Sequence, residues 1–490
     1  MGTGWISKAY NSPVKLGAYL LLTVSLAVGV IVSIVPLLGI FLTGVIAALC
    51  LSWGILIGLG AWRRYSYFYV ILWLFSILSG NVYLLSLGSA ALWLSLSDLF
   101  LIFSLVVVVY EYRRVDLKRG PTLIIGVLMA FLTISFFRGL MAAAPTRALA
   151  GVKAVTGGLL FFMIAEKVRL DDRVIEKLFL ALYIWACCFL LFILRFILMT
   201  AQDYGFSIVY VVLNKVDYST PLGRTNYLAS IALFLWPLVF FGTLMVSRGF
   251  QKILGIIALC ASVGTLFLVF SRGALIVFGW TLPVILGVGF YQFVHRSRYL
   301  RGLIVFSIVT TLLVGGITIA SWSWLKPIGE AVWRLLTSPS IWVEYRSAQA
   351  RFQLWQNAVD AFVQSPLLGE GLYNVIDINP ATETRLLVHN LPLQLLSETG
   401  VVGFSLYSLA LFIAAFRLLK KFTKYRRTPT RAALCIGVLA GLCVSLIHSM
   451  VEANFLTRDF DLLFWGILGL ALNERGVQQN YEEMYRAESL

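Results

Sequence analysis

The sequence predicts an all-α fold, a polytopic bundle of transmembrane helices with one large loop outside the membrane. Two observations predict it. Of the 490 residues, 60% are hydrophobic and only 13% are charged, whereas about a quarter of the residues in a soluble domain are charged. Apolar stretches of roughly 20 residues, the length that a helix needs to cross about 30 Å of hydrocarbon, recur along the whole chain.

We expect about 12 to 14 spans. The range arises because some neighbouring apolar stretches are joined by hairpins so short that they can be counted as one span or as two. The apolar stretches are residues 15–35, 38–62, 67–85, 91–110, 121–140, 152–166, 176–199, 226–246, 253–270, 274–293, 303–320, 399–416, 432–448 and 459–472.

The spans divide the chain into five parts. Residues 1–222 form an N-terminal transmembrane half, residues 223–320 further transmembrane helices, and residues 321–398 the large outer loop. Residues 399–473 form the C-terminal transmembrane helices and residues 474–490 a cytoplasmic tail. Functional residues concentrate in long, well-placed loops, so we expect the site in the outer loop and around it.

Lys and Arg residues gather in alternate connections between the spans. The basic connections are residues 63–64, 113–119, 167–177, 296–301 and 417–431. Because cytoplasmic connections carry an excess of Lys and Arg, these segments and both termini are expected inside and the large loop outside. The net charge of +16 is then attributed to connections that face anionic lipid, and nucleic acid is not an expected partner.

The large loop contains a predicted amphipathic helix over residues 342–364, in which aromatic residues alternate with Arg346 and Arg351. Such a helix is expected at the membrane surface or as a cap on the bundle. The glycine turn that follows, residues 366–371, is of a kind that holds backbone amides close to a ligand. Pro392 is predicted in the first turn of the next helix, which puts His389 just before that helix.

Four arginines, Arg138, Arg195, Arg224 and Arg272, lie at or near the predicted outer ends of spans. A charged residue at the bilayer centre costs about 2.5 to 3.5 kcal/mol, so arginines in spans extend to the interface, form ion pairs or line polar cavities. Several arginines on one side, against the inward bias of the other basic residues, favour a pocket for phosphate.

The chain has three histidines, and they differ in their neighbours. His295 lies in a basic cytoplasmic segment and is given no role. His448 ends a span shortly before Glu452, and either faces the same cavity as the loop residues or is an interface residue. His389 is the strongest candidate, because polar residues follow it on the next helix: Asn390, Gln394 and Glu398. No spacing typical of metal ligands is present, so no metal is expected.

The order of these elements resembles the O-antigen ligase and O-antigen polymerase superfamily over residues 220–475. The matching motifs are Gly223-Arg224-Thr225-Asn226-Tyr227-Leu228-Ala229, Ser271-Arg272-Gly273-Ala274, Arg351 with Trp355 before Pro366-Leu367-Leu368-Gly369-Glu370-Gly371, and His389-Asn390 leading through Gln394 and Glu398 to Gly400. The resemblance implies a GT-C type glycosyltransferase of the bacterial cytoplasmic membrane. Such an enzyme transfers a glycan from undecaprenyl pyrophosphate to an acceptor hydroxyl at the outer face, with no nucleotide sugar, metal or other cofactor.

The resemblance assigns the family's arginines and loop histidine to Arg224, Arg272, Arg351 and His389. Arginines suit a pyrophosphate leaving group because they neutralise its charge. His389, at a helix N-terminus, is the leading candidate for the base that activates the acceptor, with Glu398 in reserve. Attack from the face opposite the leaving group predicts inversion at the anomeric carbon.

The expected partners are the lipid-linked donor, a lipid, protein or glycan acceptor, and membrane lipids. The candidate substrate-binding residues are Asn226, Arg346, Asn390, Gln394, Glu398, Arg138, Arg195 and His448.

Two other functions remain open. A polymerase of the same superfamily extends one lipid-linked chain with another, and the motifs do not separate it from a ligase. An anion transporter of the bicarbonate type belongs to a different class and predicts discontinuous helices at the membrane midplane. The candidate residues cluster at one face instead, which favours the enzyme.

Overall fold

The protein is described from a computed structural model. It covers residues 120–141, 145–168, 170–213, 225–294, 346–374 and 388–473, with short pieces at 70–71, 73–74, 77, 83–85, 94–95, 377–378 and 385–386. The predicted spans at 15–35, 38–62 and 303–320, the C-terminal tail and Arg224 lie outside the described residues.

The described residues are almost entirely helical, and seven helices are long and apolar enough to cross a membrane. The predicted fold class is confirmed. The helices are α6 (Gly120–Met141), α7 (Pro145–Lys167), α8 (Asp172–Tyr204), α9 (Ile208–Leu213), α10 (Thr225–Met245), α11 (Phe250–Val269), α12 (Arg272–Val294), α16 (Arg346–Gln364), α17 (Leu391–Lys424), α18 (Pro429–His448) and α19 (Arg458–Leu472).

Two pairs of very short antiparallel strands complete the described elements: β1 (Tyr83–Leu85) with β2 (Leu94–Ser95), and β3 (Asp377–Ile378) with β4 (Arg385–Leu386). The predicted spans over residues 67–85 and 91–110 are therefore wrong where β1 and β2 form. Ser79, Gly80 and Asn81, which precede β1, are residues that favour turns over helix.

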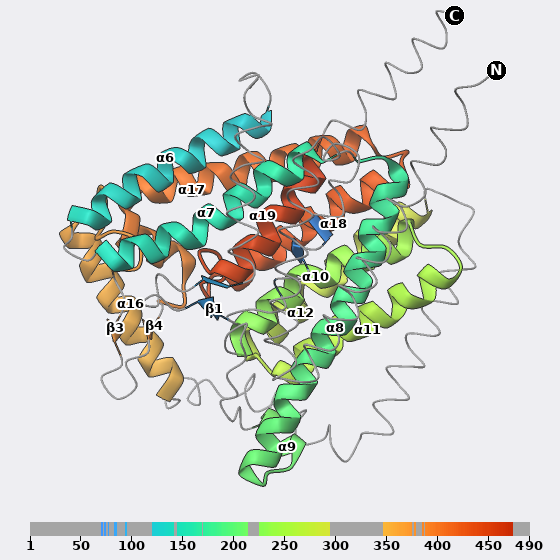
Figure 1. Ribbon diagram of the computed structural model, residues 1–490, viewed down its shortest axis with the longest axis horizontal. Coiled ribbons are helices and arrows are strands. Elements are labelled where there is room, and N and C mark those ends of the chain that lie inside the picture. Colours follow the sequence, from blue (N-terminus) through green and yellow to red (C-terminus); the bar gives the residue numbers. More distant parts are fainter. Residues whose placement is uncertain are drawn as a thin grey trace, which may run out of the picture.

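Helix α7 packs closely on α19, and α10 packs on both α11 and α18 (Figure 1). Small residues permit the close approach of α7 and α19. A Cβ built on Gly466 would lie 2.6 Å from the ring of Phe161, and one on Gly469 would lie 2.6 Å from the carbonyl oxygen of Phe162. Helices in membranes associate through such close packing, since lipid offers apolar surface of its own.

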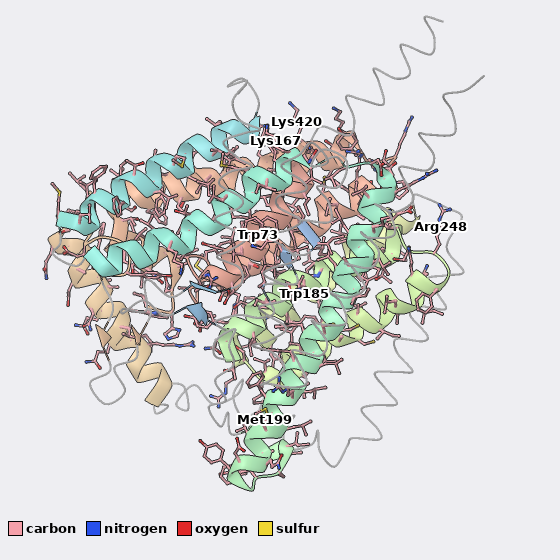
Figure 2. The ribbon with its side chains drawn as sticks, viewed as in Figure 1. Trp73, Lys167, Trp185, Met199, Arg248 and Lys420 are labelled. Atoms are coloured by element: carbon pink, nitrogen blue, oxygen red, sulfur yellow. The ribbon has the colours of Figure 1, made fainter. Side chains whose placement is uncertain are left out.

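The two ends of the bundle differ in charge. Figure 2 shows Lys167, Lys420 and Arg248 at one end, and Met199 toward the other. The first end, here called the basic end, also carries the exposed arginines at the α17–α18 connection, Arg426 and Arg427. The opposite end, here called the loop end, carries α16 and the residues that precede α17 (Figure 1).

Helix α17 is interrupted at Gly400, whose φ of 63° and ψ of −171° are not helical. The turn at 366–371 docks on this interruption and replaces the missing backbone hydrogen bonds of the helix. Val401 N donates to Pro366 O (2.9 Å) and Gly371 N donates to Glu398 O (2.7 Å). The amides of the glycine turn thus donate hydrogen bonds to carbonyl groups of α17. The predicted boundary between the outer loop and the C-terminal helices, at 398/399, falls beside the kink at Gly400.

Candidate functional site

Glu452 is the centre of a polar cluster at the loop end. It lies between α18 and α19, it is buried, and its carboxylate is approached from three sides. Asn226, near the start of α10, donates from Nδ2 to Oε2 (2.7 Å), and Arg351 of α16 lies with Nη2 3.4 Å from the same oxygen. His389, just before α17, has Nδ1 2.7 Å from Oε1. Elements far apart in the sequence therefore meet at one carboxylate.

The charge of Glu452 is stabilised by these neighbours. Burial raises the pKa of Glu452, but the contact with His389 and the positive charge of Arg351 outweigh burial, so that the pKa lies below its ordinary value. Glu452 is therefore an ionised carboxylate, which accepts hydrogen bonds and donates none. His389 Nδ1 must carry the proton in their contact, and the imidazole is held with Nε2 turned away from the carboxylate.

The backbone around His389 is held by hydrogen bonds to α16 and to the residue that follows α18. Val388 O accepts a hydrogen bond from Trp355 Nε1 of α16 (3.0 Å), and Leu391 N donates to Ser449 O (2.8 Å). Asn390 caps α17 by accepting from Leu393 N. His389 itself has a φ of 54°, a left-handed conformation that is uncommon outside glycine and persists where the surroundings enforce it.

A second network lies beside Glu452 and includes His448. His448 is buried, and its Nδ1 lies 2.8 Å from Asn454 Nδ2 and 3.3 Å from Ser230 Oγ. Ser230 also donates to the backbone oxygen of Asn226 (2.8 Å), which links this network to the cluster around Glu452. His448 is thus packed among protein groups next to the cluster, and its predicted role in substrate binding stays a prediction.

Arg272 begins α12, next to the cluster. The preceding residue, Ser271, donates from Oγ to Asn226 Oδ1 (3.0 Å), and a Cβ on Gly273 would lie 2.9 Å from Val451. The start of α12 is therefore packed against the connection that carries Glu452, although Arg272 is 46 positions from Asn226 in the sequence.

Three other predicted residues belong to a separate group at the glycine turn. Arg138 donates from Nε to Gly369 O (2.6 Å) and also contacts Glu370, with Nη2 to Oε1 at 3.8 Å. Gln394 Nε2 lies 3.3 Å from Glu398 Oε1, and both side chains are buried beneath the turn. The structure thus gives Arg138, Gln394 and Glu398 contacts that hold the turn on α17, apart from the His389 cluster.

The remaining predicted residues are placed as follows. Arg195 lies on α8 with its guanidinium 5.7 Å from the centre of the Phe196 ring. Asn390 donates from Nδ2 to Met450 O (2.9 Å) and so joins the loop to the α18–α19 connection. Arg346 begins α16, and its side chain lies outside the described part.

Glu452 is given no role by the sequence, in which it stands only as a neighbour of His448. An acidic residue between two apolar spans was the available signal, but nothing in the sequence says that Arg351 and His389 reach it. In the part of the chain that the structure describes, no three His, Cys, Asp or Glu side chains form a group that could hold a metal ion.

The comparison with family models gives a match over residues 256–408 to the family described as O-antigen ligase. The matched residues include Arg272, Arg351 and His389, and they lie within the wider region of resemblance at 220–475. A search of curated proteins finds no match. Together with the seven helices that are able to span a membrane, the match shows that this multi-pass membrane protein carries a domain of the O-antigen ligase superfamily.

Proposed function

We propose that this protein transfers a glycan from undecaprenyl pyrophosphate to an acceptor hydroxyl, as a metal-independent, inverting glycosyltransferase of the O-antigen ligase type. The observation that carries the proposal is the cluster in which His389 and Arg351 meet on the buried Glu452, beside the start of α12. The cluster brings a candidate base, His389, close to the arginines Arg351 and Arg272, and all three lie in the region that matches the family. The reaction needs both a base and cations.

His389 acts as the general base in this proposal. Glu452 accepts a hydrogen bond from Nδ1–H and thereby keeps Nε2 as the nitrogen with the free electron pair. Nε2 takes the proton of the acceptor hydroxyl as the hydroxyl oxygen attacks the anomeric carbon. The imidazolium that forms is stabilised by the ionised carboxylate. One displacement from the face opposite the leaving group inverts the anomeric centre.

The arginines act on the leaving group. As the bond between the anomeric carbon and the phosphate oxygen breaks, negative charge accumulates on the pyrophosphate, and Arg272 and Arg351 stabilise it. Arg351 is half-buried and 3.4 Å from Glu452, so the carboxylate also fixes the position of the guanidinium. Arg224 joins this group by its family motif.

The loop end is the outer face of the membrane in this proposal. The exposed Lys and Arg side chains of the basic end support this orientation, because such residues remain on the cytoplasmic side. The lipid-linked donor then presents its diphosphate to the cluster from the outer leaflet.

The test is a transfer assay with the purified chain, undecaprenyl-pyrophosphate glycan and candidate acceptors, with release of undecaprenyl pyrophosphate as the readout. Replacing His389 by Ala is expected to lower the rate about 10²- to 10⁴-fold, the usual contribution of a general base. Arg272→Ala is expected to lower it about 10²- to 10³-fold through lost charge stabilisation. Arg248→Ala, an exposed arginine at the basic end, is the matched control and should leave the rate unchanged.

Normal release by the His389 and Arg272 variants would refute this assignment of the site. The acceptor that is consumed separates the two enzymes: a second lipid-linked glycan indicates a polymerase, and a lipid or protein hydroxyl indicates a ligase. Absence of release with every acceptor would favour the anion transporter.

A further inference from the structure

Helix α16 has three different faces. Leu354 and Ala358 are buried and α16 packs on α17. A second face is exposed and mainly apolar, with Phe352 at 62%, Val359 at 44% and Val363 at 69% exposure, and Gln356 is the one exposed polar residue beside them. The third face is polar and exposed, and consists of Gln353, Asn357, Asp360 and Gln364.

The two exposed faces are separate stripes along the helix. Phe352, Val359 and Val363 are spaced by seven and four residues, and therefore lie above one another. The polar residues repeat with the same spacing but are displaced by about 100° around the axis, one residue further along the helix. An amphipathic helix with an apolar stripe beside a polar one is the form that lies in a membrane interface.

The apolar stripe of α16 continues onto a membrane-spanning helix. Past the C-terminal end of α16, Leu367 (69%) and Leu368 (43%) are exposed. Arg138, in the last turn of α6, holds the chain on both sides of these leucines through Ser365 Oγ and Gly369 O. Phe137 and Met141 of the same α6 turn are exposed as well, and α6 qualifies as a membrane span.

Figure 1 shows α16 crossing the ends of α6 and α7 and not continuing along them. A helix in this position has one flank toward the bilayer and the other toward water. Apolar surface that is continuous with the lipid-facing side of a span is covered by lipid when the protein is in a bilayer.

We propose that the apolar stripe of α16, formed by Phe352, Val359 and Val363, is a lipid-binding surface that inserts into the acyl-chain boundary of the leaflet at the loop end. The polar stripe then faces water. Because Arg351 lies on α16, this insertion holds the Arg351–Glu452 contact at the depth of the lipid head groups. The lipid contact itself does not depend on glycan transfer and is tested without it.

The experiment uses the full chain with its six native cysteines replaced, reconstituted in nanodiscs. Single cysteines carry an environment-sensitive fluorophore at Phe352→Cys or Val363→Cys on the apolar stripe. The matched controls, Gln353→Cys and Gln364→Cys, lie one position along the same exposed helix. Brominated lipids should quench the first pair and leave the second pair bright, and aqueous iodide should do the reverse.

Equal quenching of both pairs by iodide would overturn the proposal, and so would an apolar pair that neither quencher reaches, because a protein partner would then cover the stripe. A second measurement needs no substitution. Photoactivatable acyl chains in the nanodisc should form adducts on Phe352, Val359 or Val363 of the unaltered protein, and adducts confined to the membrane spans would contradict lipid contact with α16.

Discussion

At the scale of single residues, the site depends on a buried carboxylate, Glu452, whose charge is stabilised by polar and cationic neighbours. Glu452 is buried, and removal of a charge from water is costly unless partners surround it. Asn226, Arg351 and His389 are those partners, and each comes from a different element. The same contacts that stabilise Glu452 therefore position His389 and Arg351.

This arrangement predicts a stability that depends on pH below about 4.5. The pKa of Glu452 is lowered in the folded protein, so the unfolded chain binds the proton first as the pH falls. Stability contributed by Glu452 is complete above its ordinary pKa and is lost as the pH falls through the folded value. Glu452→Gln should remove this part of the acid sensitivity, measured as thermal unfolding in detergent between about pH 3 and pH 6.

Asp360→Asn, which alters an exposed acid of α16, is the control and should keep the acid sensitivity of the wild type. An unchanged pH profile in the Glu452 variant would mean that the ion pairs around Glu452 contribute nothing to folding.

At the scale of elements, the glycine turn and the interrupted α17 form one unit. Gly369 and Gly400 both have positive φ and stand where backbones touch. A Cβ on Gly369 would lie 2.4 Å from the Glu398 carbonyl carbon, and one on Gly400 would lie 2.3 Å from the Leu367 backbone. Glycine is required because no other residue leaves room for this contact.

Gly369→Ala is therefore expected to lower the free energy of unfolding by about 1 to 3 kcal/mol, the usual cost of overpacking. The expected measurement is a lower thermal unfolding midpoint in detergent. Gly264→Ala is the matched control, since its added Cβ meets nothing within 4 Å. Equal midpoints for the two variants would show that the turn moves away from α17 without cost.

At the scale of the whole molecule, the two ends of the bundle differ. Lys167, Lys420 and Arg248 lie at the basic end (Figure 2), and α16 lies at the loop end, where Arg351 joins the polar cluster (Figure 1). This polarity supports the proposed orientation, in which the basic end is cytoplasmic, because cytoplasmic connections retain Lys and Arg. In the proposed orientation, it also separates the candidate chemistry from the anionic lipids of the cytoplasmic leaflet.

The orientation is tested by labelling single cysteines in intact cells with a membrane-impermeant maleimide. In a background without native cysteines, Asp360→Cys at the loop end should react in intact cells. Lys420→Cys at the basic end should react only after permeabilisation, because both positions are exposed and differ in their side of the membrane. Labelling of Lys420→Cys in intact cells would reverse the proposed orientation.

The helical membrane fold, the basic end and the position of His389 before α17 could all be predicted from the sequence, because hydrophobicity, charge bias and helix capping are local properties. The sequence misassigned the helix near β1 and β2, where turn-forming residues interrupt an apolar run. The contacts between the polar residues, in contrast, are visible only in the folded protein. Glu452 is 63 residues from His389 and 101 from Arg351, and no local pattern records a contact at that separation, since it arises when helices distant in the chain pack together.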